Sequence, residues 1–331
     1  MYYKRNSKID KLTLFFLNGV SIVFKTLSLI YLKLKSLRQK RFPDTLVISI
    51  DNLSFGGTGK TSLVMEIGKN FEKKNIKFAI ITRGYKSKFE NQNTKVQSHH
   101  SVKEVGDEAI ILKKRFPRQD IYVGKNRQQS MKKAVRDRNK IILLDDGFQT
   151  TNIRKDIKIL LFNPTHPYYY LRNFKFLMKN EDFLFFYNTH FKDEEKFKPA
   201  TCGIYHFDPE RFYDPEGKTI DVAGSSLLGF SALGDNLRFK NDLSAFNMKE
   251  FKGFNDHHTF TESEIKNLNR LRKEKKIDYL VCTEKDFIKL TGINLKNTPL
   301  IYTQNSIKFN IDLIGYLLEY AKKKNNNKTP C

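Results

Sequence analysis

The chain has 331 residues, of which 39% are hydrophobic, and a formal net charge of +24 at pH 7. This length allows a sizeable core and favours two domains over one. Its three cysteines, Cys202, Cys282 and Cys331, are isolated, which excludes a small disulfide scaffold and a cysteine-based zinc site and fits a reducing compartment. The charge favours a polyanionic partner, either nucleic acid, an anionic membrane face or a phosphorylated substrate, although part of it reflects a Lys- and Asn-rich composition.

Residues 12–34 are strongly apolar and have basic residues on both sides. The segment is long enough to span a membrane, but Lys25 lies at its middle, where a charge is costly. On a helix, Lys11, Asn18, Ser21, Lys25, Ser28 and Lys35 form a polar stripe opposite Leu12, Phe16, Val20, Val23, Leu27, Ile30 and Leu34. We therefore expect an amphipathic helix in the membrane interface, with its lysines toward anionic head groups. A helix that packs in the protein core is the alternative.

Short apolar runs alternate with polar helical stretches along the rest of the chain, which predicts a parallel sheet covered by helices. Strands are expected at 45–50, 77–82, 120–123, 140–144 and 157–162, with helices at 60–74, 107–115 and 127–137. A smaller α/β domain is expected from strands at 227–232, 278–282 and 299–302 and helices at 261–275 and 311–323. Thr283 and Asp286 also predict a capped helix after the strand at 278–282.

The run SFGGTGKTS at 54–62 directly follows the apolar stretch at 45–50, and so combines the strand, glycine loop and helix start of a phosphate-binding loop. Its glycines permit positive φ, and the helix from Lys60 directs its positive dipole end at an anion. Lys60 would reach the β/γ-phosphates and Thr61 would hold Mg²⁺. Ser54 departs from the usual glycine, and a plain glycine turn is the alternative. The nucleotide-binding residues are expected to be Ser54, Phe55, Gly56, Gly57, Thr58, Gly59, Lys60 and Thr61.

Polar residues also follow two of the predicted strands, where ligands bind in such sheets. Asp145 and Asp146 follow the strand at 140–144, and carboxylates there can position Mg²⁺ beside a nucleotide; a polar turn is the alternative. Arg83 follows the strand at 77–82 and is suited to clamp a phosphate. Asp107, at a predicted helix start, fits both a general base and a capping residue.

Seven runs occur in this order: VISIDNLSFGGTGKT, ITRGY, VGDEAIILKKR, VGKNR, IILLDDGFQ, FNDHHTFT and VCTEKDFIKL. Together, from about residue 47 to residue 290, they resemble the tetraacyldisaccharide 4'-kinase family of lipid A biosynthesis. The resemblance implies a P-loop NTPase-like α/β fold and transfer of the ATP γ-phosphoryl group to the 4'-hydroxyl of a lipid disaccharide 1-phosphate. It places the protein on the cytoplasmic face of the inner membrane, peripheral or anchored by the N-terminal helix. The family's loop does not begin with glycine, which accounts for Ser54.

The resemblance also implies roles for individual residues. Asp107 becomes the general base, supported by His257, while Lys60 stabilises the transferred phosphoryl group. Thr61, Asp145 and Asp146 are the expected Mg²⁺ ligands. The expected substrate contacts are Arg83, Tyr85, Arg127 and Arg172.

The implied organisation is a membrane-associated helix at 1–43, a P-loop kinase domain at 44–200, a smaller α/β domain at 201–321 and a disordered basic tail at 322–331. Asn173 stands where the family usually has glutamate, which predicts slower catalysis or the use of another carboxylate, with Glu181 and Asp182 nearby in sequence. Two other classes stay open: a P-loop kinase or GTPase that acts on a soluble substrate, and a nucleic-acid-binding protein. Neither nucleic acid nor a protein partner is expected.

Overall fold

The computed structural model describes residues 11–54, 58–164, 166, 168–189, 200–256 and 258–326. The chain forms two compact units: the larger holds the described residues up to His206 and from Ile307 onward, and the smaller holds Phe207–Ser306. Strands β8 (Thr201–Tyr213) and β13 (Leu300–Phe309) each begin in one unit and end in the other. The last helix, α9 (Leu313–Asn326), belongs to the larger unit. Most of its residues were expected in the smaller domain at 201–321.

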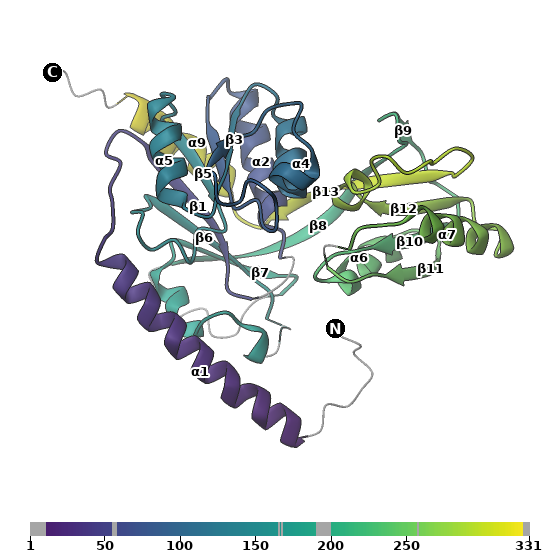
Figure 1. Cartoon of the computed structure of the whole chain (residues 1–331), viewed down its shortest axis with the longest axis horizontal. Helices are drawn as coiled ribbons and strands as arrows, with labels where there is room; N and C mark the ends of the chain where they lie inside the picture. The colour runs from purple at the N-terminus through teal and green to yellow at the C-terminus, as the bar shows by residue number, and fades with distance from the viewer. Residues whose placement is uncertain are drawn as a thin grey trace. The chain divides into compact units, whose positions relative to one another are not determined.

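The larger unit is built on a twisted sheet in the order β8-β7-β6-β1-β5-β2-β4-β3 (Figure 1). Its pairs are parallel except for β3, which runs antiparallel to β4. The bounds are β1 (Leu46–Asn52), β2 (Ala79–Thr82), β3 (Thr94–Lys95), β4 (Asp120–Val123), β5 (Ile141–Asp145), β6 (Ile157–Phe162) and β7 (Phe183–Tyr187). The five strands expected in this half of the chain are confirmed, and the predicted α/β class with them.

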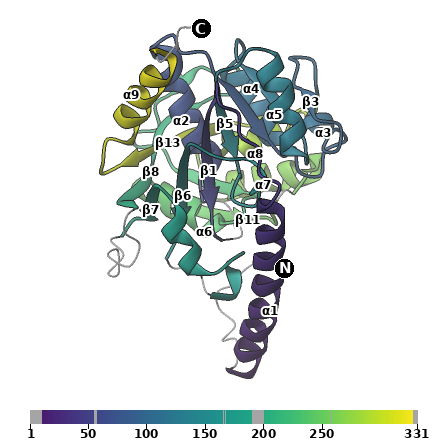
Figure 2. The same ribbon diagram turned by 90° about the vertical axis from the view of Figure 1, so that its left-hand side faces the viewer.

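Helices cover both faces of this sheet, because alternate strand residues are buried on opposite sides. On one face Phe183 contacts Tyr316 of α9, and α9 in turn contacts α2 (Figure 2). On the other face Leu184 packs with Leu32 of α1, and Val47 packs with Met131 of α5. The helices are α1 (Lys11–Ser36), α2 (Lys60–Lys73), α3 (Val102–Val105), α4 (Asp107–Arg115), α5 (Arg127–Arg136), η1 (Tyr168–Tyr170) and η2 (Lys175–Asn180).

Helix α1 turns its polar stripe toward the protein and its apolar stripe away from it. Lys25 is fully buried, and its Nζ donates to the Tyr168 carbonyl at 2.7 Å. On the opposite side Leu12, Phe16 and Leu34 of the apolar stripe are 78%, 67% and 61% exposed. The expectation that the stripe lysines face head groups is therefore wrong for Lys25. Packing in the protein core is also excluded, since the apolar stripe is the exposed one.

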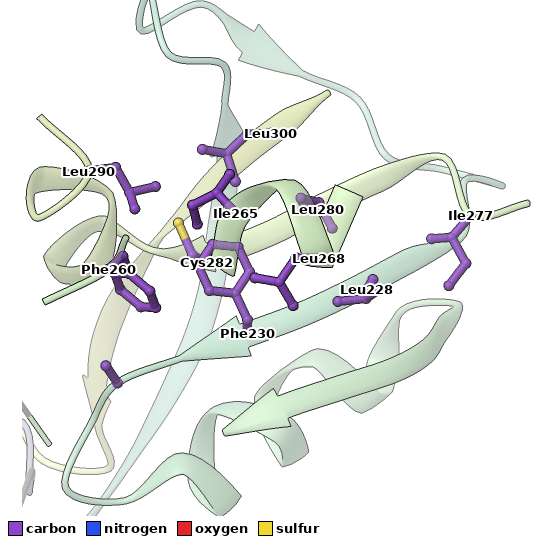
Figure 3. Packing of buried hydrophobic residues seen from close by; sticks show 11 residues of the cluster. Leu228, Phe230, Phe260, Ile265, Leu268, Ile277, Leu280, Cys282, Leu290 and Leu300 are labelled. Atoms are coloured by element: carbon purple, nitrogen blue, oxygen red, sulfur yellow. The ribbon is translucent and has the colours of Figure 1, made fainter. Parts of the chain in front are cut away.

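The smaller unit contains four parallel strands in the order β11-β10-β12-β13. Figure 3 shows its core, where Phe230 of β10 and Cys282 of β12 pack with Ile265 and Leu268 of α7. Its elements are β9 (Thr219–Ile220), β10 (Leu227–Ser231), α6 (Asn236–Asp242), η4 (Leu243–Ala245), β11 (Met248–Gly253), α7 (Glu262–Glu274), β12 (Tyr279–Thr283) and α8 (Glu284–Ile288). Thr283 accepts the N–H of Asp286 at 3.1 Å, so the predicted capped helix is confirmed.

Candidate active site

The strand, loop and helix of the predicted phosphate-binding loop follow one another as expected. Strand β1 ends at Asn52 and α2 begins at Lys60, with Gly59 at the N-cap position and a φ of 92°. That positive φ favours glycine and turns the chain into the helix. Phe55, Gly56 and Gly57 lie outside the described residues. In the described part of the loop, the hydroxyls of Ser54 and Thr58 are buried without a hydrogen-bond partner. They therefore point to a polar ligand at the start of α2.

The second carboxylate after β5 is held by two cations. Lys60 Nζ, from the first residue of α2, lies 3.8 Å from Asp146 Oδ1. Arg172 Nη1 donates to both carboxylate oxygens of Asp146, at 3.0 and 3.1 Å. Burial raises the pKa of Asp146, but the charges of Lys60 and Arg172 outweigh it and hold the pKa well below its usual range. Asp146 is therefore ionised at physiological pH, and it links the phosphate loop to the end of β5.

The first carboxylate, Asp145, is in the opposite electrostatic situation. Its side chain is buried, and Thr82 Oγ1 donates to Oδ2 at 3.4 Å, while Oδ1 has no hydrogen-bond partner. Burial raises the pKa of Asp145 to about 7, and the negative charge of Glu108 contributes to the rise. A buried carboxylate oxygen without a donor, in a negative environment, suits a divalent cation with a preference for oxygen ligands.

Glu108 was not predicted to belong to the site, although it lies within the expected helix at 107–115. It is the second residue of α4, and its charge acts on both Asp145 and Arg127. The sequence signal for Glu108 is the acidic pair at 107–108. Acidic residues at a helix start also interact favourably with the helix dipole, so the pair alone does not indicate a functional site. Only the sheet order, which places β2 next to β5, brings this helix start toward Asp145.

Arg127 was expected to contact the substrate, but its side chain is buried inside the protein. Its guanidinium is buried; Nη1 donates to the Gly124 carbonyl, and Nη2 donates to the Asp145 carbonyl at 3.5 Å. These bonds join the start of α5 to the end of β5. Arg127 therefore supports the strand ends, and its charge reaches Asp145 and Asp146 from within the protein.

Arg83 and Tyr85 lie on a loop that contacts the start of α4, where Asp107 is the first residue. A Cβ atom on Gly106, before α4, would lie 3.4 Å from the Cα of Gly84, so both positions require close backbone approach. The Arg83 guanidinium lies 5.0 Å from the exposed Tyr85 ring, and its Nε donates to Glu90 at 2.7 Å. Asp107 Oδ1 accepts the N–H of Glu108 at 2.9 Å.

The histidine pair falls partly outside the described residues, since His257 is not among them. His258 bonds Glu264 through Nε2 at 3.0 Å and stacks on Phe254. Glu264 belongs to the capping box of α7 with Thr261. His258 therefore has a structural role at the start of α7.

Asn173, the predicted departure, is fully buried beside the phosphate loop. Its neighbour Leu171 forms a β-bridge with Ser54, and Arg172 donates its backbone N–H to the Leu53 carbonyl. The amide oxygen and nitrogen of Asn173 are both buried and have no hydrogen-bond partner among the described residues, which do not include 55–57 of the loop. This position is therefore polar and close to the loop, but it carries no charge.

Known proteins have related sequences and a related fold. The profile of the family described as Tetraacyldisaccharide-1-P 4'-kinase matches residues 13–321. The chain is similar to the tetraacyldisaccharide 4'-kinase of Halothermothrix orenii, with 27% identity over 94% of each chain. It is also similar to that of Rickettsia conorii, with 29% identity over 83% of this chain and 85% of the relative. A crystal structure described as "apo" form LpxK from Aquifex aeolicus in complex with ATP has the same fold. Its TM-score is 0.69 at 24% identity, over 92% of this chain and 97% of that one.

Proposed function

This chain belongs to the tetraacyldisaccharide-1-phosphate 4'-kinase family, and from that premise we propose that it transfers the γ-phosphoryl group of ATP to the 4'-hydroxyl of a tetraacyldisaccharide 1-phosphate. The observation that carries the proposal is the Asp146 carboxylate, bonded to Arg172 and close to Lys60 at the start of α2. It joins the phosphate-loop lysine to a strand-end carboxylate, which is the arrangement that phosphoryl transfer from a nucleotide requires.

The nucleotide end of the site is assigned to residues 54–61. The described hydroxyls of Ser54 and Thr58 and the N-terminus of α2 support this, because unpaired polar groups and helix N–H donors bind phosphate. The description of the Aquifex aeolicus LpxK structure as a complex with ATP agrees with it. In the proposed arrangement Lys60 contacts the transferred phosphoryl group, while Arg172 keeps Asp146 ionised and in place.

Asp145, Asp146 and Thr61 are the residues that would hold Mg²⁺. The unpaired Oδ1 of Asp145 fits this role, and an adjacent cation would favour its ionised form. When bound, Mg²⁺ neutralises charge on the nucleotide phosphates and the transferred group. Asp146 is already bonded to Arg172, so we expect Asp145 to provide the principal protein carboxylate.

Proton removal from the acceptor hydroxyl is assigned to Asp107. A sugar hydroxyl is a poor nucleophile, and a positioned base accelerates such a step by roughly 10²- to 10⁴-fold. The start of α4 supports the assignment to Asp107, since the charge of its neighbour Glu108 acts on Asp145.

The acceptor side of the site is assigned to exposed and half-buried groups. Arg83 and Tyr85 remain candidates, whereas Arg127 and Arg172 act by holding the strand ends and Asp146. A cavity of about 410 Å³ adjoins α1 and the chain after β5, and we place the acceptor phosphate there. Its lining combines basic side chains with an apolar wall, and we assign Lys33, Arg154 and Lys158 to the acceptor phosphate. Lys155 also lines the cavity, but its amine is bonded to the Gly147 carbonyl.

Membrane association through α1 completes the proposal. By length and composition the helix is able to cross a membrane, and its outward stripe is apolar and exposed. The inward stripe is occupied by contacts such as that of Lys25 with Tyr168, which a membrane-crossing helix free of the protein would lose. We infer that α1 lies in the interface of an anionic membrane, at its cytoplasmic face, with its outward stripe among the acyl chains.

The test is phosphate transfer from Mg²⁺-ATP to a tetraacyldisaccharide 1-phosphate in mixed micelles, with native protein, Lys60→Ala and Asp107→Ala. Lys266→Ala, an exposed change on α7, serves as the control. We expect transfer by the native chain and the control, and losses of at least about 100-fold in the two site variants. No transfer by native protein that binds ATP would contradict the proposal. Deletion of residues 1–41 distinguishes the proposed lipid kinase from a P-loop kinase that acts on a soluble substrate. Unchanged turnover of a soluble acceptor by the deletion variant would favour the soluble-substrate kinase.

A further inference from the structure

We propose that Asp51 and Lys155 fix the loop that carries Asp145 and Asp146, and that they act as positioning residues for phosphoryl transfer. The inference rests on the proposed function, because the reaction that these residues would support is the proposed phosphoryl transfer. Neither residue belongs to the predicted site. Asp51 lies near the end of β1, and Lys155 lies between β5 and β6.

The first contact is made by Lys155. Its Nζ donates to the carbonyl of Gly147 at 2.6 Å, and Gly147 directly follows Asp146. A charged donor makes a stronger hydrogen bond than a neutral one. The amine is thus attached to the backbone one residue beyond the carboxylate pair.

The second contact is made by Asp51. Its side chain is fully buried, and Ser49 Oγ donates to Oδ2 at 2.7 Å, whereas Oδ1 has no hydrogen-bond partner among the described residues. The backbone N–H of Phe148 lowers the pKa of the carboxyl. Asp51 therefore fixes the hydroxyl of Ser49, which lies against Gly147, the same residue that Lys155 bonds. A third bond, from Asp146 N to the Ile50 carbonyl at 3.0 Å, joins the loop to β1 as well.

The loop needs this support because its backbone is tightly constrained. Asp146 has a φ of 57°, in the left-handed region that non-glycine residues adopt at a cost. A Cβ atom on Gly147 would lie 2.3 Å from Ser49 Oγ, so the loop is pressed against β1. A conformation of this kind persists only when surrounding contacts fix it. Asp51, Lys155 and Ser49 supply those contacts on the α1 face of the sheet.

Asp51 and Lys155 also interact electrostatically. Burial raises the pKa of Asp51, and the positive charge of Lys155 opposes that rise. Lys155 also opposes the rise in the pKa of Glu181, the next acidic group in the cluster. Removing the amine therefore leaves a carbonyl without its donor and two buried carboxyl groups without their cation.

The experiment compares Lys155→Met with Lys155→Arg, and Asp51→Ala with Asp51→Asn. The conservative variant of each pair retains a donor or an acceptor at the loop. Lys113→Met is the matched control, since Lys113 Nζ also donates to backbone carbonyls, those of Pro117 and Gln119, at 3.0 Å. Two quantities are measured on folded protein: amide hydrogen exchange of the peptide 145–150, and kcat and KM for each substrate.

We expect Lys155→Met and Asp51→Ala to exchange faster at 147–149 and to lose about 10- to 100-fold in kcat, because small displacements of aligned groups are costly. KM values should change by less than about threefold. Lys155→Arg and Asp51→Asn should recover most of kcat, and Lys113→Met should change neither quantity. Unchanged exchange at 147–149 overturns the inference whatever the activity. A raised acceptor KM with unchanged kcat overturns it too, because Lys155 would then bind the acceptor. If native protein transfers no phosphate, the proposed reaction fails, and hydrogen exchange alone decides on the positioning role.

Discussion

Replacement of Glu181 by glutamine should stabilise the protein at alkaline pH and not at acid pH. Glu181 is 7% exposed, and its Oε2 has no hydrogen-bond partner. Burial raises its pKa from 4.5 to about 8, the charge of Asp51 adds to the rise, and Lys155 and Lys158 oppose it. Asp182 contributes a smaller rise. The folded state therefore retains a proton that the unfolded state releases.

The sign and size of the effect follow from this difference in pKa. Below pH 4.5 the carboxyl is protonated in both states, and its contribution to stability is fully present. As pH rises through about 8, ionisation in the folded state removes that contribution. Each pH unit between the two values is worth about 1.4 kcal/mol, so the loss is on the order of 5 kcal/mol above pH 8. Glutamine does not titrate, and it avoids this loss.

The assay is calorimetric unfolding of native protein and Glu181→Gln in detergent micelles between pH 4.5 and pH 9. The Tm difference should be close to zero at pH 4.5 and grow to roughly 10 °C in favour of the variant at pH 9. The Tm difference between the two proteins is used because the titration of other groups, including Asp145, affects both proteins in the same way. The exposed change Glu262→Gln is the control and should give a small, constant difference. A Tm difference that stays constant with pH, or is largest at acid pH, would refute the reasoning.

Three further predictions concern other parts of the molecule. Arg172→Gln should cost about 1–2 kcal/mol at pH 7, because Asp146 is partly exposed, and should lower kcat, as urea unfolding and the transfer assay would show. A loss that grows toward pH 3 would contradict this, because the stabilising contribution of Asp146 falls as its carboxyl becomes protonated in the unfolded state. Phe15→Ser with Phe16→Ser should weaken binding to anionic vesicles by about 100-fold in a flotation assay, with micellar turnover retained. Phe230→Ala should cost about 3–5 kcal/mol in the smaller unit, observed as faster hydrogen exchange in β10 and β12.

Periodicity and turn residues were sufficient to predict most of the architecture. Strands β4 and β6 and helix α4 have the predicted bounds, because an apolar run or a helix start defines each end. Strand β7 was not predicted, although Phe183–Tyr187 is almost wholly apolar, since a short apolar run does not distinguish a strand from a buried helix turn. The position of α9 was also inaccessible, because its packing on β7 depends on contacts distant in sequence.

The candidate site was predictable wherever a motif joined a strand to its chemistry. Lys60 and Asp146 fall close together because two parallel strands end at the same edge of the sheet. The role of Arg127 could not be read from the sequence, since a buried arginine bonded to carbonyls and a substrate-binding one have the same local pattern. Asp51 was equally hidden, because alternation in a strand does not reveal which polar residue supports a neighbouring loop.

Helix α1 carries the strongest argument for a membrane among the described residues. A soluble helix buries its apolar stripe, because transfer of a large apolar side chain from water contributes about 1.5–3 kcal/mol. Here the polar residues Ser21 and Lys25 are buried together with Leu32, and the Lys25 amine is accommodated because it donates a hydrogen bond to the Tyr168 carbonyl and the Tyr168 ring lies 3.2 Å from it. We therefore propose that the exposed stripe from Leu12 to Leu34 is buried by a partner outside the described chain. For a family that acts on an acylated disaccharide, the bilayer that contains the acceptor is the partner that fits both the helix and the reaction.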